Sequence, residues 1–403
     1  MQSKDEHQIT RPNVENTLPE PPLIIVSLEG FTPSSLSCYG SSWNQTPTID
    51  QLAASGCLWD RLIASDDQPV QLLAHWTQAQ HDWVERCKQN GSIELITDRP
   101  FDNTDESCFD EITILPTEPV SERSSPAAEC FETRFAQLIA AVVERLQSGE
   151  SLGAIWLHSN FLAECWDAPV EPFESFAETS LAEHQEGEGG PIDDGPDAQL
   201  MNQIASSVKP AQFENLPNDH PDLVMLWMNR YGQQIQLIDL MIDYLLDEVT
   251  NDDPCLVLLG ASGFRLGQGD FFGTQATNLR SADLQIPLLH TGSSPLRIPH
   301  LTSSDELPEI LKRLVSEHEG HFPESRWSMR MSDAQPIQIQ TNRSPYAVMT
   351  PDWWLVTDPD GSEHLYLKPD DGEDYNDVAR LRMDVVDDLL NLKKKPASDP
   401  DGA

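Results

Sequence analysis

Four polar residues stand where an α/β fold could use them for chemistry. Glu29, His158 and Ser262 each follow a short apolar run, and Asp67 lies two residues before Pro69. Carboxylates are ligands of hard divalent cations, aspartate can be a nucleophile in phosphoryl transfer, and histidine changes charge near neutral pH. Because sites in α/β proteins form at the carboxyl ends of strands, we expect Glu29, Asp67 and Ser262 to meet in one cleft.

The elements that must position these residues alternate along the chain. Short, largely apolar runs bounded by turn residues predict buried strands at 23–26, 93–97, 112–115, 153–157, 255–259 and 286–289. Apolar residues at helical spacing predict helices at 48–54, 70–88, 131–146, 221–249 and 306–317. Strands that alternate with helices predict an α/β domain over 21–320, with a mostly parallel mixed sheet sandwiched by helices.

The rest of the chain has a different composition. Three short strands at 346–349, 353–357 and 363–367 and a helix at 378–392 predict a small C-terminal antiparallel sheet plus helix over 336–395. Residues 170–219 are rich in Glu, Asp, Gly and Pro, which favours an acidic surface excursion. Residues 1–20 and 396–403 are predicted to be tails, the first of them disordered.

Composition narrows the classes of partner and the compartment. The 67 acidic and 25 basic residues give a formal net charge of -42, which repels nucleic acid and anionic membranes. Seven scattered cysteines without CxxC spacing predict neither a disulfide framework nor a zinc site. The N-terminal segment lacks the apolar stretch of a signal peptide, so we expect a cytoplasmic protein.

Residues 24–40 read Ile-Ile-Val-Ser-Leu-Glu-Gly-Phe-Thr-Pro-Ser-Ser-Leu-Ser-Cys-Tyr-Gly, and residues 46–53 read Thr-Pro-Thr-Ile-Asp-Gln-Leu-Ala. These two neighbouring segments resemble the opening of the sulfatase family, part of the alkaline phosphatase superfamily. Later segments that resemble the family in the same order are 156–158, 166–169, 231–239, 282–289, 350–354, 364–366 and 374–377. The resemblance covers most of residues 22–392 and implies an alkaline-phosphatase-like fold in a divergent bacterial sulfatase-like member.

The resemblance also implies a metal site, usually for Ca²⁺, of which little is left here. Glu29 matches the family's first acidic ligand, but Gly30 stands in the place of the second. Ala261 and Ser262 stand where the family has a late Asp–His or Asp–Asn pair. One carboxylate and one hydroxyl cannot supply the six or more oxygens that Ca²⁺ takes. Glu29 and Ser262 are therefore predicted to be remnants of a metal site.

The nucleophile implied by the resemblance is altered as well. The family's Cys/Ser-x-Pro-x-Arg box becomes residues 67–71, so that Asp67 replaces the Cys or Ser and Gln71 the Arg. An aspartate nucleophile needs cations to offset its repulsion from an anionic ester. His158 is either a leftover active-site histidine or a structural one.

Two hypotheses follow. The favoured one is a pseudoenzyme with no cofactor, retained for binding or regulation, whose partner is a protein or a small sulfated or phosphorylated ligand. The alternative is a sulfuric or phosphoric ester hydrolase with a rearranged site around Glu29, Asp67, His158 and Ser262, which would use Ca²⁺.

Overall fold

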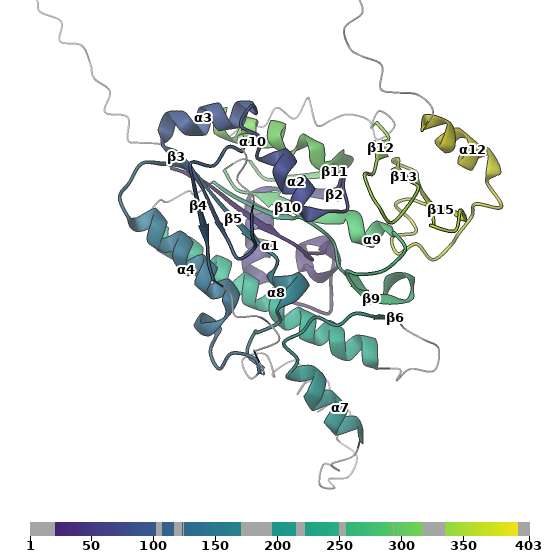
Figure 1. Cartoon of the computed structure of the whole chain (residues 1–403), viewed down its shortest axis with the longest axis horizontal. Coiled ribbons are helices and arrows are strands. Elements are labelled where there is room, and N and C mark those ends of the chain that lie inside the picture. Colours follow the sequence, from purple (N-terminus) through teal and green to yellow (C-terminus); the bar gives the residue numbers. More distant parts are fainter. Residues whose placement is uncertain are drawn as a thin grey trace, which may run out of the picture.

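The computed structural model describes residues 21–101, 107–116, 123, 125–170, 196–214, 222–249, 255–292, 294–316 and 335–393. Its centre is an eight-stranded sheet with the order β11-β2-β10-β7-β1-β5-β3-β4 (Figure 1). The strands are β1 (Leu23–Leu28), β2 (Cys57–Ile63), β3 (Ser92–Thr97), β4 (Glu111–Ile114), β5 (Leu152–Ser159), β7 (Leu256–Gly260), β10 (Gln285–His290) and β11 (Leu296–Ser303). β10 runs antiparallel to both of its neighbours, and the other pairs are parallel. The prediction of a mixed, mostly parallel sheet is confirmed.

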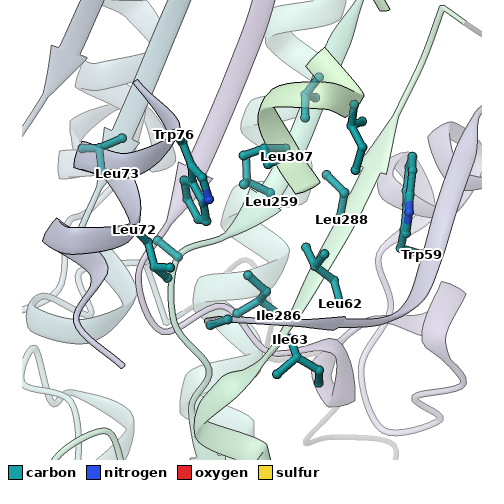
Figure 2. Close-up of a cluster of buried hydrophobic side chains, with 14 of the residues drawn as sticks. Trp59, Leu62, Ile63, Leu72, Leu73, Trp76, Leu259, Ile286, Leu288 and Leu307 are labelled. Atoms are coloured by element: carbon teal, nitrogen blue, oxygen red, sulfur yellow. The ribbon is translucent and has the colours of Figure 1, made fainter. Parts of the chain in front are cut away.

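Helices cover both faces of this sheet. Successive side chains of a strand point to opposite faces, so Leu23 and Ile25 of β1 join one apolar cluster, whereas Ile24 and Val26 join the other. The first cluster lies under α2 (Pro69–Trp76), α3 (Asp82–Asn90) and α10 (Leu307–Ser316). The second lies under α1 (Pro47–Ser55), α4 (Arg134–Gln147) and α8 (Leu223–Glu248). Figure 2 shows part of the first cluster, with Trp76 of α2 among side chains of β2, β7, β10 and α10.

Two strands of the main sheet, β2 and β11, fall outside the runs that the sequence predicts. The apolar pattern of β2 is interrupted by Asp60 and Arg61, both of them partly buried. Arg297 of β11 donates from Nε to Asp60 Oδ1 at 2.7 Å. Asp60 thus pairs with a half-exposed arginine of the neighbouring strand, and both polar residues of β2 lie where the strand is only partly buried.

The smaller C-terminal sheet contains β12 (Ile337–Gln338), β13 (Tyr346–Met349), β14 (Trp353–Thr357) and β15 (Glu363–Leu367), all antiparallel. α12 (Met383–Leu392) packs on one of its faces through Val386 and Leu389. The helix begins at Met383 and not at 378: Val378 is still bonded to β15 through the Leu365 carbonyl, and the N–H groups of Leu381 and Arg382 close a turn on the Val378 carbonyl. The small antiparallel sheet with its helix agrees with the prediction.

The remaining elements are short. A third sheet joins β6 (Phe213–Glu214), β8 (Arg265–Leu266) and β9 (Phe271–Gly273), and the other helices are α5 (Phe161–Glu164), α7 (Pro196–Ala205) and α9 (Ser281–Leu284). The predicted tails lie outside the described residues, as do 171–195 of the acidic segment. The described part of that segment contains α7, which contacts α8, and β6, which pairs with β9. None of the helices in the described ranges has the length and apolar character needed to cross a membrane.

Candidate active site

Glu29 follows β1 directly and is almost fully buried. Its Oε1 accepts a hydrogen bond from Arg99 Nη1 and lies 3.2 Å from Nε2 of His158. Burial raises the pKa of Glu29, but the contacts with His158 and Arg99 outweigh it and hold this pKa below its usual range. The Glu29 carboxylate is therefore charged and already paired with a cation of the same chain.

His158 belongs to a buried chain of hydrogen bonds that runs between β5 and β1. Trp156 Nε1 donates to Ser27 Oγ at 2.8 Å, and Ser27 Oγ lies 2.8 Å from His158 Nδ1. An indole N–H only donates, so Ser27 accepts from Trp156, and its own proton can go to Nδ1 or to the Leu157 carbonyl at 3.4 Å. The charged Glu29 carboxylate can only accept, so Nε2 carries the proton that faces it. Both ring nitrogens have partners and the residue is 1% exposed, which is the geometry of a structural histidine.

Ser262 lies on the loop after β7 and contacts the loop after β1. The Gly30 N–H donates to Ser262 Oγ at 2.8 Å, and the Ala261 N–H donates to the Leu28 carbonyl at 2.7 Å. Gly30 has a φ of +75°, a conformation that glycine adopts without the steric cost of a Cβ. These contacts place Glu29 and Ser262 at the same edge of the sheet, as expected from the carboxyl ends of parallel strands.

Asp67 lies between β2 and α2, and its side chain is completely buried. Its Oδ2 accepts from Thr341 Oγ1 at 2.6 Å and from Arg343 Nε at 2.8 Å. Burial raises the pKa of Asp67, but the hydrogen bonds from Thr341, Arg343 and Gln68 outweigh it and lower this pKa below its usual range. The candidate nucleophile is thus a charged carboxylate held by residues that precede β13.

Arg343 connects Asp67 to the loops around β7. Its Nη1 lies 3.3 Å from Oδ2 of Asp283, whose carboxylate also accepts from Nε and Nη2 of Arg265. The Asp283 carbonyl accepts from the N–H of Gly263, the residue that follows Ser262. Asp67 therefore reaches the Ser262 loop through a continuous chain of contacts. That these groups line an open cleft remains a prediction.

Two more buried carboxylates pair with arginines. Asp98 follows β3 and pairs with Arg134 of α4, with 2.7 Å between Oδ2 and Nε. Arg123 donates to Asp167, a completely buried residue. Ser159, whose carbonyl accepts from the Glu29 N–H, donates from Oγ to Asp98. Buried acidic groups at this edge of the sheet are consistently matched by arginines.

The residues at this edge do not fit the Ca²⁺ site that the resemblance implies. Glu29 Oε1 is bound to a guanidinium, and the Ser262 hydroxyl accepts a backbone N–H instead of facing an open position. Gly30 and Ala261 carry no oxygen or nitrogen in their side chains. Among the described residues, no group of three or more His, Cys, Asp and Glu side chains is arranged to hold a metal ion.

The sequence reasoning missed two residues that define this site, Arg99 and Arg343. Arg99 lies two residues after β3, so the rule that pointed to Glu29 and His158, a polar residue at a strand end, could have found it. Arg343 lies 276 positions from Asp67 in the sequence, and no spacing or motif connects them.

The chain matches no family model and no curated protein, but it is similar to solved structures. The phosphonate monoester hydrolase of Agrobacterium radiobacter has a TM-score of 0.66 and 15% identity, over 93% of this chain and 96% of that chain. A protein solved with its substrate D-glucosamine-2-N,6-O-disulfate has a TM-score of 0.64 and 13% identity, over 94% and 99% of the two chains. A 2-O GAG sulfatase has a TM-score of 0.59 and 12% identity, over 93% of each chain.

Nearly the whole described chain therefore has the fold that these sulfatases and phosphonate monoester hydrolases share. This confirms the fold implied by the resemblance of residues 24–40 and 46–53. At such low identity the likeness concerns the fold, so chemistry has to be argued from the residues of the site.

Proposed function

We propose that this chain is a sulfatase-like protein that does not hydrolyse esters and is retained for binding or regulation. The observation that carries the proposal is the pair between Arg99 and Glu29. Glu29 is the one carboxylate that matches a family metal ligand, and a guanidinium already neutralises it. A divalent cation at this carboxylate would meet the positive charge of Arg99 at short range, which is strongly unfavourable in a buried site.

The surroundings of Asp67 support the same proposal. An aspartate nucleophile must present a carboxylate oxygen to the substrate. Oδ2 of Asp67 is bonded to Thr341 and Arg343, and Oδ1 accepts from Gln68 Nε2 at 3.0 Å. Three of the roughly four acceptor positions of this carboxylate are thus occupied. Solvent does not reach the side chain, so an ester could approach Asp67 only if its surroundings moved.

An assay of turnover tests the proposal. The purified protein should show no hydrolysis of aryl sulfates or phosphonate monoesters above the rate of its Asp67→Asn variant, with or without added Ca²⁺, Mg²⁺ or Mn²⁺. Loss of a nucleophile removes on the order of 10⁶ in rate in well-studied hydrolases. Asp67→Cys should not restore turnover either, because the Asp–His pair and the arginine of the nucleophile box are missing.

A phosphonate monoester hydrolase assayed under the same conditions shows that the substrates and metals are competent. Calorimetric titration of the protein with each cation should show no saturable binding, because the Glu29 carboxylate is already paired with Arg99. Metal-dependent hydrolysis by the unmodified chain, abolished by Asp67→Asn, would overturn the proposal.

Metal-dependent hydrolysis that Asp67→Asn abolishes would instead support the alternative, a sulfuric or phosphoric ester hydrolase with a rearranged site and Ca²⁺ as its cofactor. One observation favours it: Arg343 supplies beside Asp67 the positive charge that Gln71 cannot supply. A cation next to the nucleophile is what an attack on an anionic ester requires. In this alternative Arg343 would bind the ester, and Arg343→Ala would lower turnover together with Asp67→Asn.

The proposed setting is the cytoplasm. Cys57 and Cys87 are buried free thiols, and burial raises the pKa of each to about 12. Buried, uncharged thiols of this kind suit a reducing compartment. The proposed ligand is a protein partner or a small sulfated or phosphorylated molecule, and the charge of -42 argues against nucleic acid.

A further inference from the structure

The C-terminal sheet exposes large apolar side chains at one end. Leu367, the last residue of β15, is 40% exposed, whereas Leu381 and Met383 are 80% and 67% exposed. Tyr375, from the loop between them, is 65% exposed. Exposed aliphatic side chains are common singly, but several that adjoin one another mark an interaction site.

Strand pairing and chain connectivity place these side chains on neighbouring segments of the backbone. Leu367 pairs with Trp353 across β15 and β14. The guanidinium carbon of Arg382 lies 5.1 Å from the centre of the Trp353 ring, and Leu381 and Met383 are the sequence neighbours of Arg382. We name Trp353, Leu367, Leu381 and Met383 the β15 patch.

The patch exists because α12 covers only part of its sheet face. Leu355 and Leu365 lie under the helix and are completely buried. Of the next pair on the same face, Leu367 is 40% exposed. Trp353 packs partly against the cluster, and the guanidinium of Arg382 lies over its ring. Figure 1 shows β15 and α12 at the outer end of the molecule, away from the main sheet. In the described part of the chain, this face is thus open to a partner.

The sequence around Leu381 and Met383 is rich in carboxylates. Residues 370–388 contain eight acidic residues and two arginines. One of the acids, Asp374, is neutralised by Lys368 in the interior, and one of the arginines, Arg382, pairs with Asp384. The exposed remainder is strongly negative, which repels a nucleic acid or an anionic membrane and attracts lysine and arginine side chains.

We propose that the β15 patch is the docking surface for a protein partner, which binds through a segment with apolar side chains flanked by lysine or arginine. This deepens the proposed binding role of the chain and rests on it. Trp353 supplies the aromatic anchor that is typical of interface centres, and the acidic rim sets the charge of the partner. The site edge at Glu29 and Asp67 takes no part in this contact.

A synthetic amphipathic peptide of leucine and lysine serves as the probe, with its binding to the full-length chain measured by fluorescence anisotropy at about 0.15 M salt. The double variant Leu381→Ser/Met383→Ser should bind about tenfold more weakly than the unmodified chain, because two apolar side chains lose their buried contact. Met225→Ser is the matched control, since Met225 is 55% exposed on α8, and its affinity should stay unchanged.

A second peptide with glutamate in place of lysine should bind at least about tenfold more weakly, since the acidic rim repels it. Equal affinity of the double variant and the Met225→Ser control would overturn the proposal, as would equal affinity for the two peptides. The serine substitutions are at exposed positions, so a thermal melt should show both variants folded. If the protein hydrolyses esters and the peptide still binds through the β15 patch, the proposal of a pseudoenzyme is wrong and the proposal of a docking surface stands.

Discussion

The surroundings of Glu29 and of Asp67 differ in where the partner side chains come from. Glu29 is held by His158 at the end of β5 and by Arg99 just after β3, and both strands belong to the main sheet. Asp67 is held by Thr341 and Arg343, which precede the second strand of the C-terminal sheet. Both carboxylates end up charged and paired, but only the pairing of Asp67 depends on how the two sheets are placed against each other.

The cation that neutralises Glu29 therefore comes from the same sheet, whereas the cation that neutralises Asp67 comes from a different one. Around Glu29, a guanidinium stands where the resemblance implies a metal ion, and the main sheet alone can build that arrangement. Around Asp67, Arg343 bridges two carboxylates of the main domain, Asp67 and Asp283. Movement of the C-terminal sheet would therefore change the charge environment of Asp67 and leave that of Glu29 intact.

The largest effect is expected from Arg99→Ala. The substitution leaves the Glu29 carboxylate, 6% exposed, with His158 as its remaining partner. Removing one partner of a buried pair destabilises by about 3 kcal/mol, at the low end of the usual range because Arg99 is itself 30% exposed. Urea unfolding measures the loss. Arg297→Ala is the control, since Arg297 is 56% exposed in its pair with Asp60 and should cost less than about 1 kcal/mol. Equal losses in the two variants would contradict a buried pair at Glu29.

A smaller effect, about 2 kcal/mol, is expected from Arg343→Ala, because Asp67 keeps Thr341 and Asp283 keeps Arg265. The effect should be confined to the C-terminal sheet. Backbone amides of β13 and β14 should exchange hydrogen faster than in the unmodified chain, while the exchange rates of β1 and β5 should not change. Arg382→Ala, which removes an exposed pair inside the C-terminal subdomain, should leave the exchange of β13 unchanged. Uniform acceleration across both sheets would show that Arg343 does not act as a link between them.

The smallest effect concerns pH and applies to Glu29→Gln and Asp67→Asn alike. Both carboxyls have pKa values below their usual range in the folded chain: the contacts with His158 and Arg99 lower that of Glu29, and the hydrogen bonds from Thr341, Arg343 and Gln68 lower that of Asp67. Their stabilisation is therefore fully present above the unfolded-state pKa, about 4, and is lost as the pH falls through the folded-state pKa. The difference in unfolding free energy between the unmodified chain and each variant should narrow from pH 6 to pH 3. A difference that stays constant or widens would mean that these carboxylates are not stabilised as anions.

Much of the fold could be read from periodicity. The run 23–26 and the amphipathic segment 131–146 identify a buried strand and a helix by their apolar spacing, and β1 and α4 lie there. β2 could not be found in this way because Asp60 and Arg61 break its apolar run, and Asp60 is neutralised by a residue of β11. Period rules assume that every residue of a buried strand is apolar, whereas Asp60 and Arg61 are only partly buried and keep some contact with solvent.

The site was only half predictable. Position at strand ends brought Glu29 and Ser262 together, and the contact between Gly30 and Ser262 bears this out. The partners of the two carboxylates were not predicted. The strand-end rule could have identified Arg99 as the partner of Glu29, but it could not have identified Arg343 as the partner of Asp67. A motif specifies backbone position, and it does not specify which distant side chain will neutralise a buried charge.

The sequence by itself determined the layers of the fold, the strand ends that carry Glu29, His158 and Ser262, and the absence of an oxygen or nitrogen atom from the side chains of Gly30 and Ala261. These properties follow from residue identity and local spacing. Only the tertiary structure decided that Arg99 neutralises Glu29 and that Arg343 neutralises Asp67 across two sheets. A buried carboxylate must find a cation or become protonated, and which cation it finds depends on which loops the packed sheets bring within a few ångströms.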